Sequence, residues 1–103
     1  MILEVAILNV RLEMAPAFEA AFSRASSLIS RMPGYRFHNL RRCIEVANRY
    51  ILLVEWDSLE AHTIGFRRSS EYQQWKALLH HFYDPFPTVE HYASLSPSVA
   101  APE

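Results

Sequence analysis

The fold of this chain is decided by residues 50–62, which read YILLVEWDSLEAH. The first seven are aromatic, β-branched or aliphatic apart from one glutamate, and this composition predicts a β-strand from Tyr50 to Trp56. Apolar side chains occupy both sides of its pleat, as is typical of a strand covered on both faces. After Trp56 the apolar period becomes helical, and Asp57 with Glu60 forms a capping-box pattern. A central strand therefore leads into a helix that carries His62 back over it.

The rest of the chain supplies a long helix and three more strands. Pro16 suits a first helical turn, and an apolar stripe at helical spacing continues to about Met32, where Pro33 and Gly34 end it. The helix after the central strand breaks at residues 67–70 and resumes with a second capping-box pattern at Ser70. The remaining strands are predicted over Ile2–Leu12, Tyr35–Val46 and Thr88–Leu95.

This order of elements predicts the fold class. Strand, helix, strand, strand, broken helix and strand make an α+β protein, a ferredoxin-like βαββαβ fold with an antiparallel four-stranded sheet. The strand from Tyr35 is the most polar and is expected near an edge of the sheet. Residues 1–96 form the predicted domain, and residues 97–103, rich in Pro and Ala, form a flexible C-terminal tail.

Composition argues against several classes of function. The 103 residues, half of them hydrophobic, suit one packed domain. A net charge of −1 gives no electrostatic basis for binding nucleic acid or an anionic membrane, so we expect neither partner. The single Cys43 fits a cytoplasmic location. With only Gly34 and Gly65 there is no Gly-rich phosphate loop, and the histidines lack metal-ligand spacing, so we expect no cofactor and no metal.

A homodimer is expected because the two strands Ile2–Leu12 and Tyr50–Trp56 are apolar on both faces. The helices of one chain can cover only one face of the sheet. Leaving about 600 Å² of the other face in water would cost on the order of 15 kcal/mol. That cost exceeds the usual net stability of a small domain. We therefore expect two copies to pack through their sheet faces about a two-fold axis.

Three motifs carry a resemblance to a known family: Tyr50-x5-Trp56-x-Ser58-x2-Ala61-His62, Ser70-x-Tyr72-x2-Trp75, and His91-Tyr92. From Ile2 to about Leu95 the chain resembles the antibiotic biosynthesis monooxygenase (ABM) domain family. The resemblance implies a dimeric α/β barrel with a pocket between the sheet and the helices of each subunit. Members of the family include cofactor-independent monooxygenases, quinol monooxygenases, haem-degrading enzymes and small proteins of unknown role.

Haem degradation is disfavoured by departures from the family's pattern. Haem-degrading members carry an Asn on the first strand, a Trp on the helix after the third strand and a His about three turns later. Asn9 matches the first of these positions. The Trp position holds Gly65 or Phe66, and the His position holds Trp75 or Lys76.

The polyketide-tailoring oxygenases resemble this chain at Trp56 but carry Asn where it has Leu52. Their implied mechanism, direct reaction of an anionic substrate with O2, needs polar groups that hold a deprotonated phenol. His62 is the expected catalytic group, as a base or as a donor to a phenolate, because an imidazole titrates near neutral pH. The alternative is a histidine packed at the barrel rim. The residues expected to bind substrate are Asn9, Trp56, Phe66, Tyr72, Trp75, His91 and Tyr92.

Several of these residues have a second interpretation. Trp56 and Trp75 either sandwich an aromatic ligand or fill the core. Asn9 either lines the pocket or marks the wet end of its strand. Because successive strand residues face opposite sides, at most one of His91 and Tyr92 faces the pocket, and the other faces the partner subunit.

Three functional hypotheses follow from the sequence and the resemblance. The first is a cofactor-independent monooxygenase of the antibiotic-biosynthesis or quinol type, acting on a small aromatic substrate between sheet and helices. The second is a non-catalytic small-ligand-binding or stress-response dimer that uses the same pocket. The third is a haem-handling protein.

Overall fold

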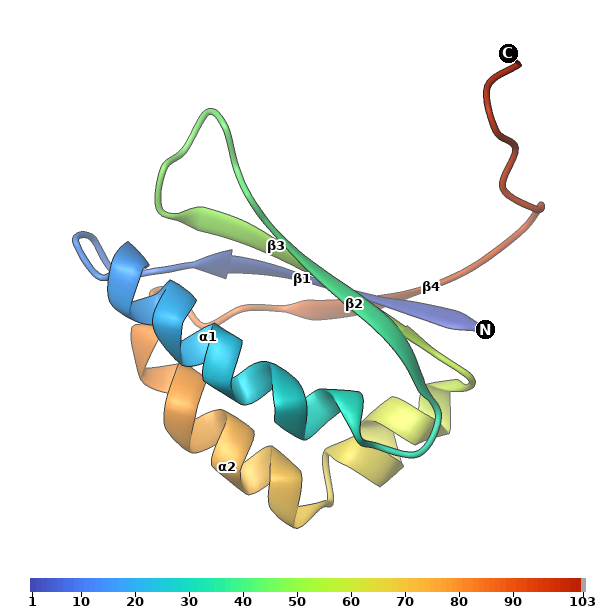
Figure 1. The fold of residues 1–103 in the computed structure, drawn as a ribbon, viewed down its shortest axis with the longest axis horizontal. Helices are drawn as coiled ribbons and strands as arrows, with labels where there is room; N and C mark the ends of the chain where they lie inside the picture. Colours follow the sequence, from blue (N-terminus) through green and yellow to red (C-terminus); the bar gives the residue numbers. More distant parts are fainter. Residues whose placement is uncertain (103) are drawn as a thin grey trace.

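The computed structural model of the chain describes residues 1–102. Its four strands form one antiparallel sheet in the order β2-β3-β1-β4, and both helices lie on one face of it (Figure 1). This arrangement confirms the predicted α+β, ferredoxin-like fold and places the polar strand β2 at an edge. The elements are β1 (Ile2–Asn9), α1 (Ala15–Ser30), β2 (Tyr35–Arg42), β3 (Arg49–Trp56), η1 (Ala61–Phe66), α2 (Ser70–Leu79), η2 (His80–Phe82) and β4 (Val89–Ala93).

The hydrophobic core lies between the sheet and the helices. Alternate residues of β3 point towards the helices, and Trp56 at its end is fully buried. The predicted apolar stripe of α1 packs against this layer. Phe18 lies 4.8 Å from the ring of Tyr50, and Phe22 lies 5.7 Å from the ring of Trp75. Burial of each large apolar side chain contributes about 1.5–3 kcal/mol, so this layer holds the helices on the sheet.

The observed strands end earlier than the predicted ones. Apolar residues continue beyond each end, but a strand needs a neighbour to pair with. At the end of β1, Asn9 pairs with the first residue of β3, and the next residue, Val10, forms an isolated bridge to Tyr83 instead of continuing the pairing with β3. The corrected ends are Asn9 instead of Leu12, Arg42 instead of Val46, and Ala93 instead of Leu95.

The first predicted helix cap is displaced by one residue. Ser58, not Asp57, accepts a hydrogen bond through its Oγ from the backbone N–H of Ala61, at 3.2 Å. The Asp57 carboxylate instead accepts a hydrogen bond from Arg36 at 2.8 Å. An ion pair with a distant strand therefore competes successfully with the local capping interaction.

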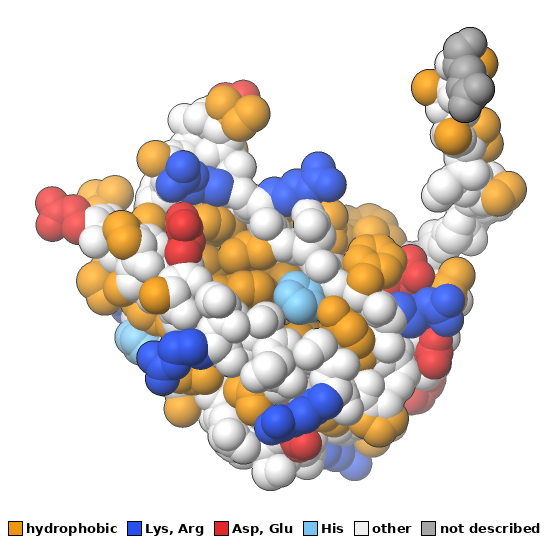
Figure 2. All heavy atoms as spheres, in the orientation of Figure 1, with side chains coloured by type: hydrophobic (Ala, Val, Ile, Leu, Met, Phe, Trp, Pro, Cys, Tyr) orange, Lys and Arg blue, Asp and Glu red, His pale blue; other side chains and the backbone are white. Residues whose placement is uncertain are grey.

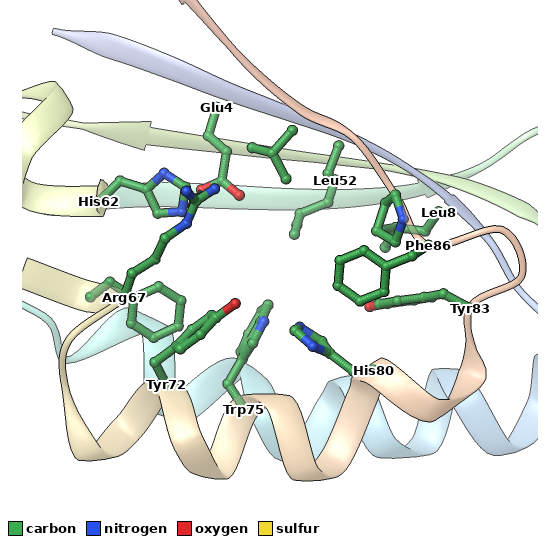
Figure 3. A pocket seen from close by; sticks show the side chains of 14 residues that line it. Glu4, Leu8, Leu52, His62, Arg67, Tyr72, Trp75, His80, Tyr83 and Phe86 are labelled. Atoms are coloured by element: carbon green, nitrogen blue, oxygen red, sulfur yellow. Dashed lines mark ion pairs between the residues drawn. The ribbon is translucent and has the colours of Figure 1, made fainter. Parts of the chain in front are cut away.

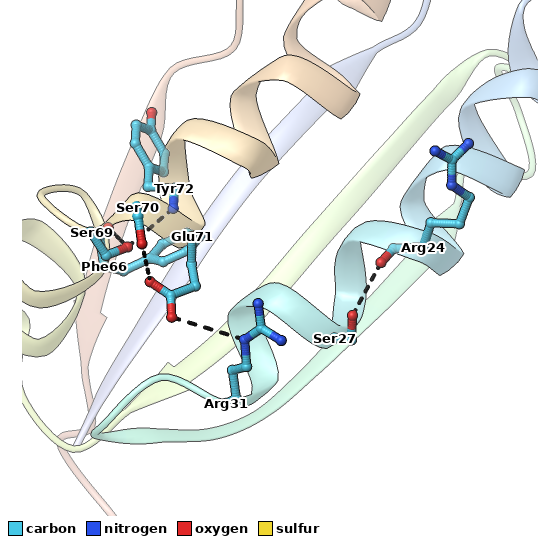
Figure 4. Close-up of polar contacts among 8 residues, drawn as sticks. All are labelled: Arg24, Ser27, Arg31, Phe66, Ser69, Ser70, Glu71 and Tyr72. Carbon is cyan, nitrogen blue, oxygen red and sulfur yellow. Dashed lines mark hydrogen bonds and ion pairs between the residues drawn. The ribbon is translucent and has the colours of Figure 1, made fainter.

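The second predicted cap is also displaced by one residue. Ser69, not Ser70, caps α2, and its Oγ accepts from the backbone N–H of Tyr72 at 3.0 Å. The Ser70 hydroxyl points to the carboxylate of Glu71 instead. That carboxylate also lies 3.9 Å from Arg31 at the end of α1, so the start of α2 is tied to α1 (Figure 4).

The sheet face opposite the helices carries apolar side chains, and neither α1 nor α2 lies over it (Figure 1). Ile7, Phe37 and Tyr92 on this face are 41%, 46% and 51% exposed, and Leu53 lies half-buried among them. We call this the outer face. After β4 the chain runs away from the sheet (Figure 1).

Lys and Arg side chains are dispersed over the face of the molecule shown in Figure 2, with apolar and neutral atoms between them.

None of the helices within residues 1–102 has both the length and the apolar character needed to cross a bilayer.

Candidate functional site

A cavity of about 210 Å³ lies between the sheet and α2 (Figure 3). This volume is below the usual range of about 300–1,000 Å³ for small-molecule pockets, so it suits a small ligand. One end carries the polar side chains of Glu4, His62 and Arg67. The rest of the lining is aromatic, imidazole or aliphatic: Ala6, Leu8, Leu52, Phe66, Tyr72, Trp75, His80, Tyr83, Phe86, Pro87 and Val89.

The strand register places Glu4 at the polar end of the cavity. Glu4 lies opposite Val54 on β3 and opposite His91 on β4. Because alternate strand residues share a face, Trp56, two residues beyond Val54, projects on the same side as Glu4. The carboxyl group is thus flanked by an indole on one neighbouring strand and an imidazole on the other.

Glu4 is a buried carboxyl group, 6% exposed, with two polar neighbours. The indole Nε1–H of Trp56 donates a hydrogen bond to Glu4 Oε1 at 2.9 Å. His62 Nε2 lies 3.3 Å from the same oxygen. Burial raises the pKa of Glu4, because it penalises the charged form, while the Trp56 hydrogen bond and the nearby Arg67 charge oppose the shift.

His62 is buried, 3% exposed, and both of its ring nitrogens face other side chains. Nε2 faces Glu4, and Nδ1 lies 2.8 Å from Nε2 of His91. Burial lowers the pKa of His62 to about 3, and the charge of Arg67 and the neighbouring His91 act in the same direction. The imidazole is therefore neutral at pH 7, so its contact with Glu4 is not an ion pair at that pH.

The local geometry of η1 delivers His62 and Arg67 to the cavity together. Residues 61–66 form a π-helical turn, and the backbone N–H of Arg67 donates to the carbonyl of His62 at 3.1 Å. Such turns join residues five apart and occur often at functional sites. Phe66 is buried beside them, and its ring lies 5.6 Å from that of Trp75 on α2. The side chain of Arg67 reaches towards Glu4 and His62 (Figure 3).

The opposite end of the cavity is formed where η2 leads into β4. The ring of His80 lies 5.0 Å from that of Phe86 and 6.1 Å from that of Tyr83. Burial lowers the pKa of His80, and the charge of Lys76 adds to this effect. Burial raises the pKa of Tyr83, so its phenol is un-ionised at pH 7. Phe86 is 64% exposed and borders the mouth of the cavity.

The structure brings several of the sequence-predicted site residues together. His62, Phe66, Tyr72 and Trp75 all line the cavity. Trp56 lies behind this lining, stacked on His62 with ring centroids 5.4 Å apart. The Trp56 ring belongs to the hydrophobic core, and its indole N–H donates a hydrogen bond to Glu4.

The other three predicted residues do not line the cavity. His91 lies on the helix side of β4 and contacts His62. Tyr92 lies on the outer face, where its hydroxyl donates to Glu90 at 3.0 Å. Asn9, near the end of β1, accepts a hydrogen bond from Arg49 at 2.9 Å. Their roles in substrate binding stay predictions, and the positions of Asn9 and Tyr92 give those roles no geometric support.

Sequence reasoning missed two polar members of the site, Glu4 and Arg67. A signal for Glu4 was present, because it is the one charged residue in the apolar part of the first strand. A charged residue inside an apolar strand is buried only at a cost and therefore signals a partner or a function. Arg67 gave no such signal, because it lies in a short basic run at a helix break. Within residues 1–102, no group of three or more His, Cys, Asp or Glu side chains could hold a metal ion.

Comparison with known proteins places this geometry in a family. A family model described as antibiotic biosynthesis monooxygenase (ABM) matches residues 1–78. The uncharacterized protein YczJ of Bacillus subtilis (strain 168) is 55% identical over 92 residues, which cover 89% of this chain and 97% of YczJ.

Solved structures show the same fold. One, described as "Putative antibiotic biosynthesis monooxygenase" from Bordetella bronchiseptica, superposes with a TM-score of 0.87 and 32% identity, covering 92% of this chain and 97% of that one. SnoaB, described as a cofactor-independent oxygenase from Streptomyces nogalater, superposes with a TM-score of 0.70 and 23% identity, covering 95% of this chain and 94% of its own. The matched family model and the shared fold agree with the predicted resemblance, and the chain belongs to the antibiotic biosynthesis monooxygenase family.

Proposed function

We propose that the protein is a cofactor-independent monooxygenase that oxidises a small hydroxyaromatic molecule in the cavity between the sheet and α2. The observation that carries the proposal is a small aromatic-lined cavity with a carboxyl group, an imidazole and a guanidinium gathered at one end. Family membership and the fold shared with SnoaB, described as a cofactor-independent oxygenase, support it.

The lining suits an aromatic substrate that becomes an anion. Phe66, Tyr72 and Trp75 offer ring faces and edges against which a flat ring can pack. The guanidinium of Arg67 lines the same cavity and makes no ion pair with another side chain of residues 1–102. Arg67 is an exposed residue, so its charge lies at the rim of the cavity, where it can pair with the phenolate oxygen of a bound substrate.

In the proposed reaction the substrate itself supplies the electrons that reduce O2. Loss of a proton from a phenol or an adjacent activated CH2 group gives an anion, which forms a C–O bond with O2. The resulting peroxide takes up a proton, and its O–O bond then breaks. One oxygen atom stays in the product as a carbonyl. The other leaves as water, with the proton lost in the first step and the one hydrogen that remained on the oxidised carbon.

Oxygen uptake tests the proposal directly. Purified protein is mixed with an anthrone or a dihydroxynaphthalene, and O2 consumption and quinone absorbance are followed together. We expect consumption above the spontaneous rate, and a loss of at least tenfold in the His62→Gln variant. His81→Gln, which changes an exposed histidine outside the cavity, is the matched control and should keep the wild-type rate.

The remaining outcomes separate the alternatives. Binding of the aromatic molecule without O2 consumption would contradict the oxygenase and favour a non-catalytic ligand-binding protein. A Soret shift on titration with hemin, again without oxygen uptake by the aromatic substrates, would favour haem handling.

We also propose that two copies pair through the outer face. Ile7, Phe37 and Tyr92 are exposed there beside half-buried Leu53, and no helix of residues 1–102 covers them. Contiguous exposed apolar surface of this kind marks an interaction site, and a self-complementary sheet face suits a two-fold dimer.

A further inference from the structure

The carboxyl group of Glu4 has one oxygen held by the protein and one open to the cavity. Oε1 accepts from Trp56 and lies beside His62 Nε2. Oε2 makes no hydrogen bond within residues 1–102. Every fully buried side-chain oxygen in that range has a hydrogen-bond partner, so Oε2 is not fully buried. Oε2 is therefore accessible, and Figure 3 shows the carboxyl group pointing into the cavity. A hydroxyl group on a bound ligand can reach this oxygen.

His62 connects Glu4 to the edge of the sheet, and both of its ring nitrogens face other side chains. Its Nε2 is 3.3 Å from Glu4 Oε1, and its Nδ1 is 2.8 Å from His91 Nε2. The first contact is long for a hydrogen bond, as is common for proton-transferring pairs before substrate binds. His91 belongs to the edge strand β4 and is partly exposed. Three groups thus lead from the cavity to solvent.

The groups around Glu4 come from every element packed against it. β3 contributes Trp56, β4 contributes His91, and η1 with the following residue contributes His62 and Arg67. Burial lowers the pKa of both imidazoles, so each is neutral at pH 7, while burial raises the pKa of Glu4. Neutral imidazoles can accept at one nitrogen and donate at the other, as a relay requires.

We propose that Glu4 is the catalytic proton acceptor of this cavity, and that His62 and His91 relay its proton to solvent. The proposal rests on the proposed function only in taking a hydroxyaromatic molecule as the ligand. It assigns His62 a place in the relay rather than direct contact with the substrate.

Protons and charges balance along the relay, because one proton is transferred at each contact. Protonated Glu4 gives its proton to His62 Nε2, His62 gives its Nδ1 proton to His91 Nε2, and His91 gives its Nδ1 proton to water. Both imidazoles are neutral before and after, with their tautomers exchanged. Ionised Glu4 then takes the hydroxyl proton of the ligand at Oε2, and the ligand anion remains beside Arg67. The relay therefore ionises Glu4 before the ligand reacts. In the oxygenase reaction Glu4 gives the proton taken from the ligand to the peroxide and is ionised again.

The proton acceptor is tested without oxygen, so the result does not depend on turnover. Wild-type protein is saturated anaerobically with 4-nitrophenol at a pH below the pKa of the free phenol. We expect the absorbance of bound 4-nitrophenolate, and at least a tenfold smaller phenolate-to-phenol ratio in Glu4→Gln, which keeps the acceptor for Trp56. His81→Gln, which changes an exposed histidine outside the cavity, should match wild type. A bound probe that stays neutral in wild type, or equal ionisation in Glu4→Gln, overturns the assignment.

The relay is tested on the ligand-free protein by ¹⁵N NMR of the two rings. As the pH rises through the titration of Glu4, His62 and His91 should exchange tautomers together, and neither should do so in Glu4→Gln. Rings that keep their tautomers in wild type, or change independently of each other, overturn the relay. Failure of O2 uptake alone would refute only the monooxygenase.

Discussion

The indole N–H of Trp56 is bonded to the carboxyl oxygen of Glu4 at 2.9 Å, across the pairing of β3 with β1. The pair joins a fully buried ring to a buried acid at the wall of the cavity. Trp56 therefore has two structural roles. Its ring fills the core, and its N–H donates a hydrogen bond to a carboxyl oxygen that would otherwise lose a partner.

Replacing Trp56 with Phe should lower the free energy of unfolding by about 2–4 kcal/mol. The variant leaves a cavity and removes the hydrogen bond to a buried carboxyl group. Urea denaturation at pH 7 measures the loss. Trp75→Phe is the matched control, because it removes the same atoms but no hydrogen bond to another residue within 1–102. Equal losses in the two variants would show that the Glu4 bond contributes nothing.

His62 should make the protein acid-sensitive. Its folded-state pKa, about 3, lies below the ordinary value of 6.5. As the pH falls below 6.5, the His62 imidazole is protonated in the unfolded chain but stays neutral in the folded chain. The free energy of unfolding therefore decreases from pH 6.5 down to about pH 3. Above pH 6.5 this group has no effect on it. The loss approaches about 1.4 kcal/mol per pH unit. Urea denaturation of wild type and His62→Gln at pH 7 and pH 5 should show a steeper decline in wild type, and parallel declines would refute the assignment.

Gly34 holds η1 against the start of β2, and a side chain there should be destabilising. Its φ is +85°, and a Cβ atom at this position would lie 2.7 Å from Cβ of Ala61. Gly34→Ala should lower the free energy of unfolding by about 1–3 kcal/mol and shift His62. Gly65→Ala is the control, because its nearest neighbour would be Glu60 O at 3.8 Å. Comparable effects of the two substitutions would contradict this account.

Charge on the outer face should separate the proposed dimer. Leu53→Lys places an ammonium group in the middle of that face, where its desolvation on pairing is costly. Sedimentation velocity at micromolar concentration should show a dimer for wild type and a shift towards monomer for the variant. Ile44→Lys changes a residue that is 94% exposed in the β2–β3 turn, outside the sheet, and should leave the dimer intact. A monomeric wild type would refute the pairing.

The architecture was predictable because each element carries its own periodic signal. The apolar stripe of α1 and the alternation along β3 were read correctly from local sequence. The caps were not, because the choice between Asp57 and Ser58 depends on Arg36, which lies on another strand. A local pattern cannot show which side chain a distant partner will engage.

The site was partly predictable for the same reason. His62, Phe66, Tyr72 and Trp75 lie on helical stripes that had to face the sheet, so their meeting at one cavity follows from amphipathic spacing. Asn9 lies near the end of β1, away from the cavity, and which side a strand residue faces depends on register.

By itself, the sequence determined the order of strands and helices, the buried stripes and the apolar outer face, since these follow from residue type and spacing along the chain. Only the tertiary structure decided that Glu4, Trp56, His62 and His91 meet. Their contact depends on the register of β1 with β3 and β4 and on the π-helical turn of η1. Hydrogen bonds act over a few ångströms, so a shift of one residue in any of these pairings would place the carboxyl group on the other face of the sheet.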